Sequence, residues 1–391
     1  MSRHYSPKNF FRHASNAFLK RYFTEHGVLL DVDFGALSET KVTPIYAAWL
    51  KLPEEVRNEM ERDFQDIDAL SCESGTQSIL DEAAWHGENL AEMFATLDSF
   101  HAKAFWTFQE RPKYWLGASA FHHADSVPAS YWRKRKNLSR AVAKVDDASL
   151  RQLENNLSHY FHNKQGRGQN CKVDCYKRGE LDYFFAYPED YAHSSIEWEG
   201  KEFRRRSHHP AFEIIFVYSQ HEGTLNVFLA GTKKLVPELQ SFFVDTILGL
   251  ELGEHLKDER VYDLALLKQR EMQFKYHPDS GITHVAVKKL RLKILGTNER
   301  ITLEASPTHN GMVVYDLLDK LKTVFTLSEL FITQVGFVVT FAHIPSRMKP
   351  ATRSFDVCWP NSCSLGNDGR DAIIRKMLAD SGIEPREQFN P

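Results

Sequence analysis

The sequence lacks the motifs and the long apolar runs that mark several large classes of protein. No apolar run approaches the ~20 residues that a transmembrane helix needs, so no membrane contact is predicted. The N-terminal segment has no apolar signal-peptide core, and no secretory signal is expected. The chain has no GxxxxGK(S/T) loop, strand-borne GxGxxG, GxSxG elbow or HExxH pair. The common nucleotide-binding, serine-hydrolase and zinc-protease signatures are therefore absent, and neither a cofactor nor a metal is predicted.

Cysteine is scarce, with five residues in 391. An odd and sparse count favours free thiols in a reducing compartment, which predicts a cytoplasmic protein. Cys171 and Cys175 have three residues between them, and Cys358 and Cys363 have four. These spacings are looser than those of most structural zinc pairs, so buried or strand-borne thiols are the preferred interpretation.

A strong net charge is also missing, because 49 lysines and arginines oppose 52 acidic residues. This balance excludes a globally basic nucleic-acid-binding protein but leaves room for local basic surfaces. Hydrophobic residues make up 42% of the chain, which is ordinary globular usage. The length predicts two or more domains.

The pattern of the chain changes near residue 170, which predicts an α+β protein. Residues 1–165 are expected to form a mainly helical domain, with helices over 7–26, 44–50, 53–70, 76–108 (divided, if anywhere, at Gly87) and 149–161. Residues 171–391 are expected to form an α+β domain of antiparallel or mixed sheet with β-β-α units and a possible sub-boundary within 253–280. Its predicted strands are 172–176, 183–187, 213–218, 224–230, 283–295, 300–305, 331–343 and 354–358, with helices at 235–250, 313–324 and 370–381. A linker is expected at 163–169, where Gly166, Arg167 and Gly168 cluster.

Charge is segregated within the helical half. Residues 51–98 hold thirteen acidic and three basic residues, whereas residues 99–144 hold nine basic and two acidic residues. The two blocks either pack together and neutralise each other or face outward toward partners of opposite charge.

Three basic clusters are the candidate nucleic-acid-binding residues. Basic side chains next to aromatic ones suit a phosphate backbone and its bases, because the cations replace counterions and the rings stack. The clusters are Arg133, Lys134, Arg135, Lys136 and Arg140 after Tyr131-Trp132; Arg204, Arg205 and Arg206; and Lys289, Arg291 and Lys293.

The third cluster lies on a strand with strict alternation. Leu290, Leu292 and Ile294 should share one face, and the three cations should share the other. Three like charges at this spacing repel one another, so solvent, neighbouring acidic side chains or a phosphate backbone must offset the repulsion.

No residue is assigned a catalytic role, but one pattern supports an alternative. Asp190 followed by Glu199-Gly200-Lys201 matches the acid and acid-x-lysine arrangement with which restriction-type nucleases hold a divalent metal and activate water. The alternative function is therefore a metal-dependent nuclease that uses Asp190, Glu199 and Lys201.

These observations predict a binding or scaffold protein of the cytoplasm rather than an enzyme. Its basic surfaces would contact nucleic acid, and its helical domain would contact a protein partner. We also expect an accessory component of a bacterial defence or mobile-element system, although no residue of the sequence supports this expectation. Besides the nuclease, a purely structural subunit of a protein complex is open as an alternative.

Overall fold

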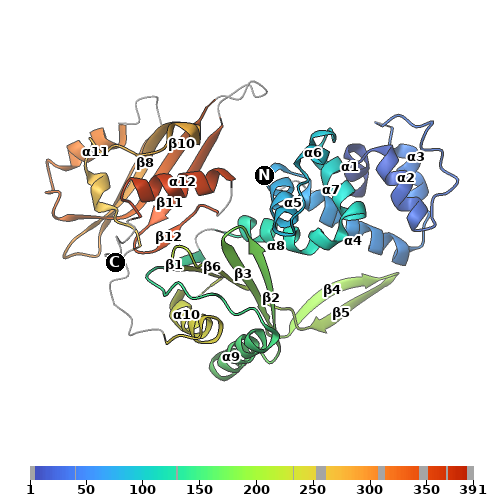
Figure 1. Cartoon of the computed structure of the whole chain (residues 1–391), viewed down its shortest axis with the longest axis horizontal. Helices are drawn as coiled ribbons and strands as arrows, with labels where there is room; N and C mark the ends of the chain where they lie inside the picture. The colour runs from blue at the N-terminus through green and yellow to red at the C-terminus, as the bar shows by residue number, and fades with distance from the viewer. Residues whose placement is uncertain are drawn as a thin grey trace. The chain divides into compact units, whose positions relative to one another are not determined.

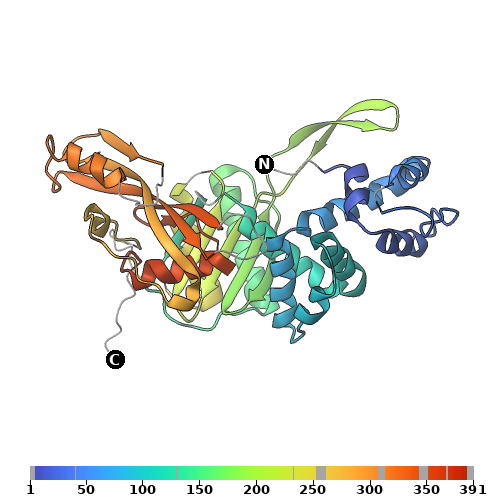
Figure 2. The same cartoon turned by 90° about the horizontal axis from the view of Figure 1, so that it is seen from above.

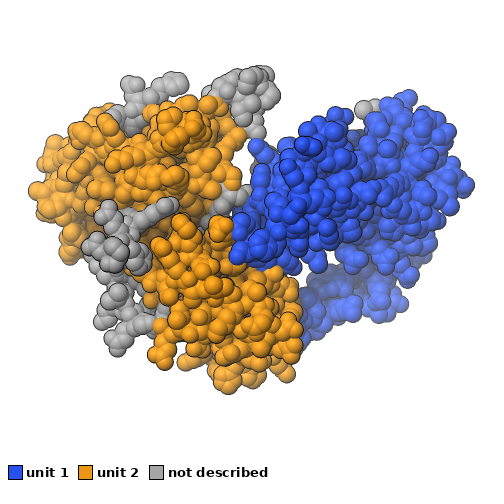
Figure 3. Space-filling model, viewed as in Figure 1, with its two compact units in different colours: residues 1–127, 176–179, 192–209 blue, residues 128–175, 180–191, 210–391 orange. Residues whose placement is uncertain are grey.

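The computed structural model describes residues 5–39, 41–128, 131–231, 233–251, 261–306, 313–342, 351–366 and 369–384, and its helices and antiparallel sheets confirm the α+β class. The chain divides into two compact units, coloured separately in Figure 3. Unit 1 comprises residues 1–127, 176–179 and 192–209, and unit 2 comprises residues 128–175, 180–191 and 210–391. The helix at 147–165 thus belongs with the sheets of unit 2.

Unit 1 is built mainly from helices (Figure 1), and these helices pack around buried aromatic side chains. They are α1 (Pro7–His13), α2 (Asn16–Glu25), α3 (Thr43–Trp49), α4 (Glu54–Leu70), α5 (Glu73–Trp85), α6 (Ala91–Ala95), α7 (Phe100–Glu110) and α8 (Trp115–Ser126). Helix α4 starts after Pro53 and carries Glu54 and Glu55 in its first turn. Acidic side chains there stabilise the helix because they interact with the positive end of its dipole. It buries Met60, Phe64, Ile67 and Leu70, which recur at helical spacing.

Two predicted helices are divided in the structure. The helix expected over 7–26 breaks at Ala14, which is extended, and restarts where the Ser15 hydroxyl accepts a hydrogen bond from the Phe18 N–H. The helix expected over 76–108 forms α5, α6 and α7, and Gly87 at φ +77° lies in the first break. The sequence analysis did not predict α8.

The end of strand β2 (Cys171–Arg178) inserts an arginine between two helices of unit 1. Arg178 is 5% exposed, and its guanidinium donates to Asp81 of α5 at 2.7 Å and Asp125 of α8 at 2.8 Å. The two carboxylates neutralise the buried guanidinium, so these ion pairs join the end of β2 to α5 and α8.

The first sheet of unit 2 has the strand order β1-β7-β6-β3-β2. Its other strands are β1 (Trp132–Arg135), β3 (Leu181–Pro188), β6 (Ile214–Ser219) and β7 (Thr224–Leu229). Every residue of β6 is buried, which explains its continuous apolar sequence. Helices α9 (Asp147–Gln165) and α10 (Val236–Phe243), with a π-helical turn at Val244–Leu248, share a hydrophobic core with this sheet.

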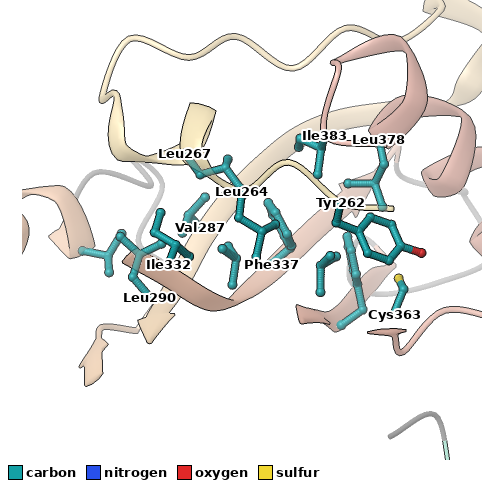
Figure 4. Close-up of a cluster of buried hydrophobic side chains, with 14 of the residues drawn as sticks. Tyr262, Leu264, Leu267, Val287, Leu290, Ile332, Phe337, Cys363, Leu378 and Ile383 are labelled. Atoms are coloured by element: carbon teal, nitrogen blue, oxygen red, sulfur yellow. The ribbon is translucent and has the colours of Figure 1, made fainter. Parts of the chain in front are cut away.

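The second sheet has the order β12-β11-β10-β8-β9. The elements follow the chain as β8 (Ile282–Ile294), β9 (Arg300–Glu304), α11 (Val313–Leu321), β10 (Leu330–Phe341), β11 (Thr352–Cys358), β12 (Ser362–Cys363) and α12 (Gly369–Asp380), which reproduces the predicted β-β-α order. Figure 4 shows part of the core, to which the sheet contributes Leu290 and Phe337 and α12 contributes Leu378. Both helices share this core, so they cover one face of the sheet and leave the other polar.

The predicted sub-boundary within 253–280 lies partly outside the described residues, which resume at 261. Val261, Tyr262, Leu264 and Leu267 are buried in the core of the second sheet. The last residue of the strand predicted over 331–343, His343, also lies outside the described residues.

A separate two-stranded ribbon joins β4 (His193–Glu199) to β5 (Glu202–His208) (Figure 2). All residues of β5 are exposed, and β4 is exposed except at Ser195, which is half-buried. The sequence analysis did not predict these strands. Among the helices that the structure describes, none is both long enough and apolar enough to cross a membrane.

Candidate nucleic-acid interface

The basic residues of β8 lie on the polar face of the second sheet, as their alternation predicted. Leu290, Leu292 and Ile294 are buried on the opposite face. On β9, the residues opposite Lys293, Arg291 and Lys289 are Arg300, Thr302 and Glu304. Residues opposite each other in antiparallel strands share a face, so Arg300 extends the basic row and Glu304 meets its far end.

Lys289 is neutralised by an acidic residue two strands away. Its Nζ lies 3.0 Å from Oδ1 of Asp356 on β11, and the pair crosses β10 at Gly336. A Cβ on Gly336 would lie 3.0 Å from both Asp356 Oδ1 and Lys289 Cβ. Glycine at this position therefore leaves the space that the ion pair occupies.

Arg291 and Lys293 differ from Lys289 because neither forms an ion pair with any residue in the described ranges. Arg291 and Arg300 are exposed, and Lys293 is half-buried. These side chains are therefore accessible to solvent, where water and salt screen the repulsion among them.

Two aromatic rings lie beside the basic row. Phe331 on β10 is opposite Lys293, so the two side chains share the polar face. The Trp359 ring, 39% exposed, packs edge-on against Phe331 with 5.1 Å between centroids. The sequence analysis did not single out either ring. The alternation of half-buried Phe331 with buried Leu330 and Ile332 is the signal that places Phe331 on the polar face.

The cluster at 133–135 occupies the interior of unit 2. Arg133, Lys134 and Arg135 form β1 and are 7%, 6% and 6% exposed. Lys134 Nζ pairs with Glu222 at 3.4 Å and also with Glu384. These three side chains are therefore enclosed by protein rather than arranged as an open basic surface.

Burial of Arg133 is accompanied by a hydrogen bond that joins β1 to the second sheet. Its guanidinium donates to Ser362 Oγ at 3.0 Å, and burial lowers its pKa. The neighbouring Lys134 N–H donates to Asn361 O at 3.0 Å, which joins β1 to the start of β12. The two other members of this cluster, Lys136 and Arg140, lie closer to solvent and line a pocket.

The cluster at 204–206 lies on the exposed β4–β5 ribbon. Arg204 pairs with Glu199 at 2.8 Å and with Glu202. Arg205 is opposite Ile196 on the other face, which also carries the paired rings of Trp198 and Phe203. One face of the ribbon is thus largely self-neutralised, and the other is apolar with a single arginine.

The residues of the nuclease alternative are each engaged elsewhere or exposed. Asp190 binds the Arg167 guanidinium at 2.8 Å within unit 2, in the predicted linker region. Glu199 and Lys201 flank the ribbon turn at Gly200, and Glu199 pairs with Arg204. Across the residues with described positions, no group of three or more His, Cys, Asp or Glu side chains could hold a metal ion.

The two charge blocks combine both predicted arrangements, although residues 128–144 of the basic block belong to unit 2. Glu88 binds Arg111 at 2.8 Å, and Asp68 binds His101 at 3.0 Å, so part of the acidic block packs against the basic block. Most other acidic residues face solvent on the helices and connections of unit 1: Glu54, Glu55, Glu59, Asp66, Glu73, Glu92 and Asp98.

All five cysteines are free thiols, and Cys363 is the buried one.

No family model and no curated protein matches the chain. The functional argument therefore depends on the geometry of the sites alone.

Proposed function

We propose that the protein binds single-stranded nucleic acid along the polar face of its second sheet and does not cleave it. The observation that supports this is the row of Arg291, Lys293 and Arg300 beside the half-buried Phe331, on which the exposed Trp359 ring packs. Cations that track a phosphate backbone and rings that stack on bases are the two elements of sequence-tolerant single-strand binding. The free thiols fit the cytoplasmic location that we also propose.

An open sheet face suits a single strand better than a duplex. Splayed bases can lie flat on rings that stand on a sheet, whereas the bases of a duplex are stacked inside it. The Trp359 ring is exposed enough to accept one base, and it packs on Phe331 of β10. Lys293 on β8 is opposite Phe331, and Arg300 on β9 is opposite Lys293. The face therefore supplies stacking and charge at one place.

The metal-dependent nuclease is the alternative proposal, and no geometric observation favours it over binding.

The apolar face of the β4–β5 ribbon supports the proposal of a protein partner for unit 1. Trp198 and Phe203 there are 68% and 57% exposed, and exposed aromatic side chains with a nearby arginine are common anchors of interfaces.

The test measures the affinity of the whole protein for single-stranded DNA, single-stranded RNA and duplex DNA over a series of salt concentrations. In Arg291→Gln/Lys293→Gln, the loss of two phosphate contacts should reduce the slope of log K against log salt by about 1.4 for single strands. Trp359→Ala should weaken single-strand binding by about 1–3 kcal/mol without changing that slope, because stacking releases no counterions.

A double variant on α9, Arg151→Gln/Lys164→Gln, is the charge-matched control, since both residues are exposed in the same unit. Equal loss of binding in this control would assign the affinity to net charge alone. Binding that is unchanged in all three variants would refute the proposed face. Trp198→Ala/Phe203→Ala, assayed in parallel, shows whether the ribbon contributes, and added Mg²⁺ shows whether cleavage occurs.

A further inference from the structure

A pocket of about 430 Å³ lies within unit 2 between the first sheet and helix α12. Its walls come from the chain after β1, from β6 and β7, and from the exposed side of α12. Small-molecule sites in proteins typically enclose about 300–1,000 Å³, so the pocket is large enough for a ligand of moderate size. The nucleic-acid interface proposed above uses none of its residues.

The sheet gives the pocket an apolar surface beside neutral polar groups. Val217 on β6 is opposite Asn226 on β7, and Ser219 is opposite Thr224, so these four side chains share one face. Leu181 is opposite Ser219 on the other side of β6 and continues the same face. A planar or apolar group can pack here while hydroxyl and amide groups donate and accept hydrogen bonds.

The charges deepest in the pocket are already satisfied. Lys134 is enclosed and pairs with Glu222 and Glu384. Arg375 donates to the carbonyl oxygens of Gly366 at 2.7 Å and Leu365 at 2.6 Å. The polar groups of Lys134 and Arg375 thus already have partners within the protein and fix this wall of the pocket.

Positive charge remains at the rim. Lys136 is half-buried and forms no ion pair within the described part of the chain. Arg140 and His221, both exposed, also line the pocket. Lys376 reaches the pocket from α12, and its Nζ pairs with Asp380 at 2.9 Å. The enclosed Lys134 already has carboxylate partners, so Lys136 is a rim cation that an anionic group of a ligand can meet.

We infer that this pocket binds a nucleoside monophosphate. The base would pack against Val217 and Leu181, Asn226 and Thr224 would bond its polar edge or the ribose, and Lys136 would hold the phosphate. The sequence has no glycine-rich phosphate loop, so side chains rather than backbone amides would bind the phosphate.

The test measures dissociation constants of AMP, GMP, CMP, UMP, adenosine and inorganic phosphate with the whole protein by titration calorimetry. At least one monophosphate should bind, and it should bind more tightly than either adenosine or phosphate alone. Lys136→Glu should weaken this binding by about tenfold to 100-fold, which corresponds to loss of one charge-assisted hydrogen bond.

A second variant, Ala379→Trp, fills the pocket from α12 and should abolish binding without removing a charge. The matched controls are Lys164→Glu and Ala148→Trp, which make the same changes at exposed positions on α9. Each variant is compared with the parent by circular dichroism so that a folding defect is recognised. No binding of any monophosphate to the folded parent protein would overturn the inference, as would binding that both Lys136→Glu and Ala379→Trp leave intact.

Discussion

Replacing Lys134 by methionine tests whether the basic run at 133–135 is part of the protein interior. The Lys134 side chain is 7% exposed and pairs with Glu384, which is 13% exposed, and with Glu222, which is 41% exposed. Methionine keeps most of the apolar stem but removes the charge, so the variant isolates the electrostatic contribution.

The expected loss follows from the exposure of the two carboxylates. Glu222 is solvated well enough that losing its partner costs little. Glu384 is mostly enclosed, and removing one partner of a buried ion pair costs about 3–5 kcal/mol. We therefore expect Lys134→Met to lower the free energy of unfolding of unit 2 by about 3 kcal/mol, or its Tm by roughly 6–12 °C.

The assay is thermal unfolding combined with hydrogen exchange of β1 and β7 peptides, which reports on unit 2 specifically. Lys134→Met/Glu384→Leu should recover to within about 1 kcal/mol of the parent, because it removes both charges together. Lys136→Met, at a half-buried position with no described ion pair, should change stability by less than about 1 kcal/mol. Unchanged stability of Lys134→Met together with reduced nucleic-acid affinity would refute the interior assignment and restore an exposed basic surface.

Two further predictions concern single positions in each unit. Burial raises the pKa of Glu82 above its usual value, although His86 partly opposes the shift, so the folded state disfavours the ionised carboxyl. The contribution of Glu82 to the stability of unit 1 should therefore be greatest below the unfolded pKa of about 4.3 and be lost as pH rises through the folded pKa. Glu82→Gln should remove that dependence in a pH series of Tm values; a variant less stable than the parent at pH 7 would contradict this. Gly336→Val should lower the free energy of unfolding of unit 2 by about 1–3 kcal/mol, because its side chain occupies the space of the Lys289–Asp356 pair. A parent-like Tm for Gly336→Val would contradict this packing argument.

Periodicity predicted the second sheet well. The strand at 282–294 alternates Leu290, Leu292 and Ile294 with cations, and only one register buries the leucines, so the position of Arg291 and Lys293 followed from local sequence. The pairing of Lys289 with Asp356 was not predictable in the same way. It depends on which strand lies beyond β10 in the sheet and on Gly336, which leaves room for the two side chains to meet across β10.

The β4–β5 ribbon was missed because its sequence has no buried face. Both strands are mostly exposed, and their apolar alternation is short, with Ile196 and Trp198 on β4 and Phe203 alone on β5. The turn at Glu199-Gly200-Lys201 was instead interpreted as part of a nuclease pattern. This hairpin is held mainly by its own hydrogen bonds and by the packing of Trp198 on Phe203. Its amino-acid composition therefore gives little indication of the two strands.

The two basic strands of unit 2 show why the density of positive charge does not itself identify a binding surface. Residues 133–135 are more densely charged than residues 289–293, yet they are the ones enclosed by protein. The difference lies in where carboxylates come from: Lys134 meets glutamates 88 and 250 residues away in sequence, which no local pattern reveals. Arg291 and Lys293 meet none among the described residues, so a mobile anion can lower their electrostatic free energy more than it can for Lys134. A basic cluster is therefore a candidate binding site to the extent that the fold leaves it unneutralised, and by that criterion β8 ranks above β1.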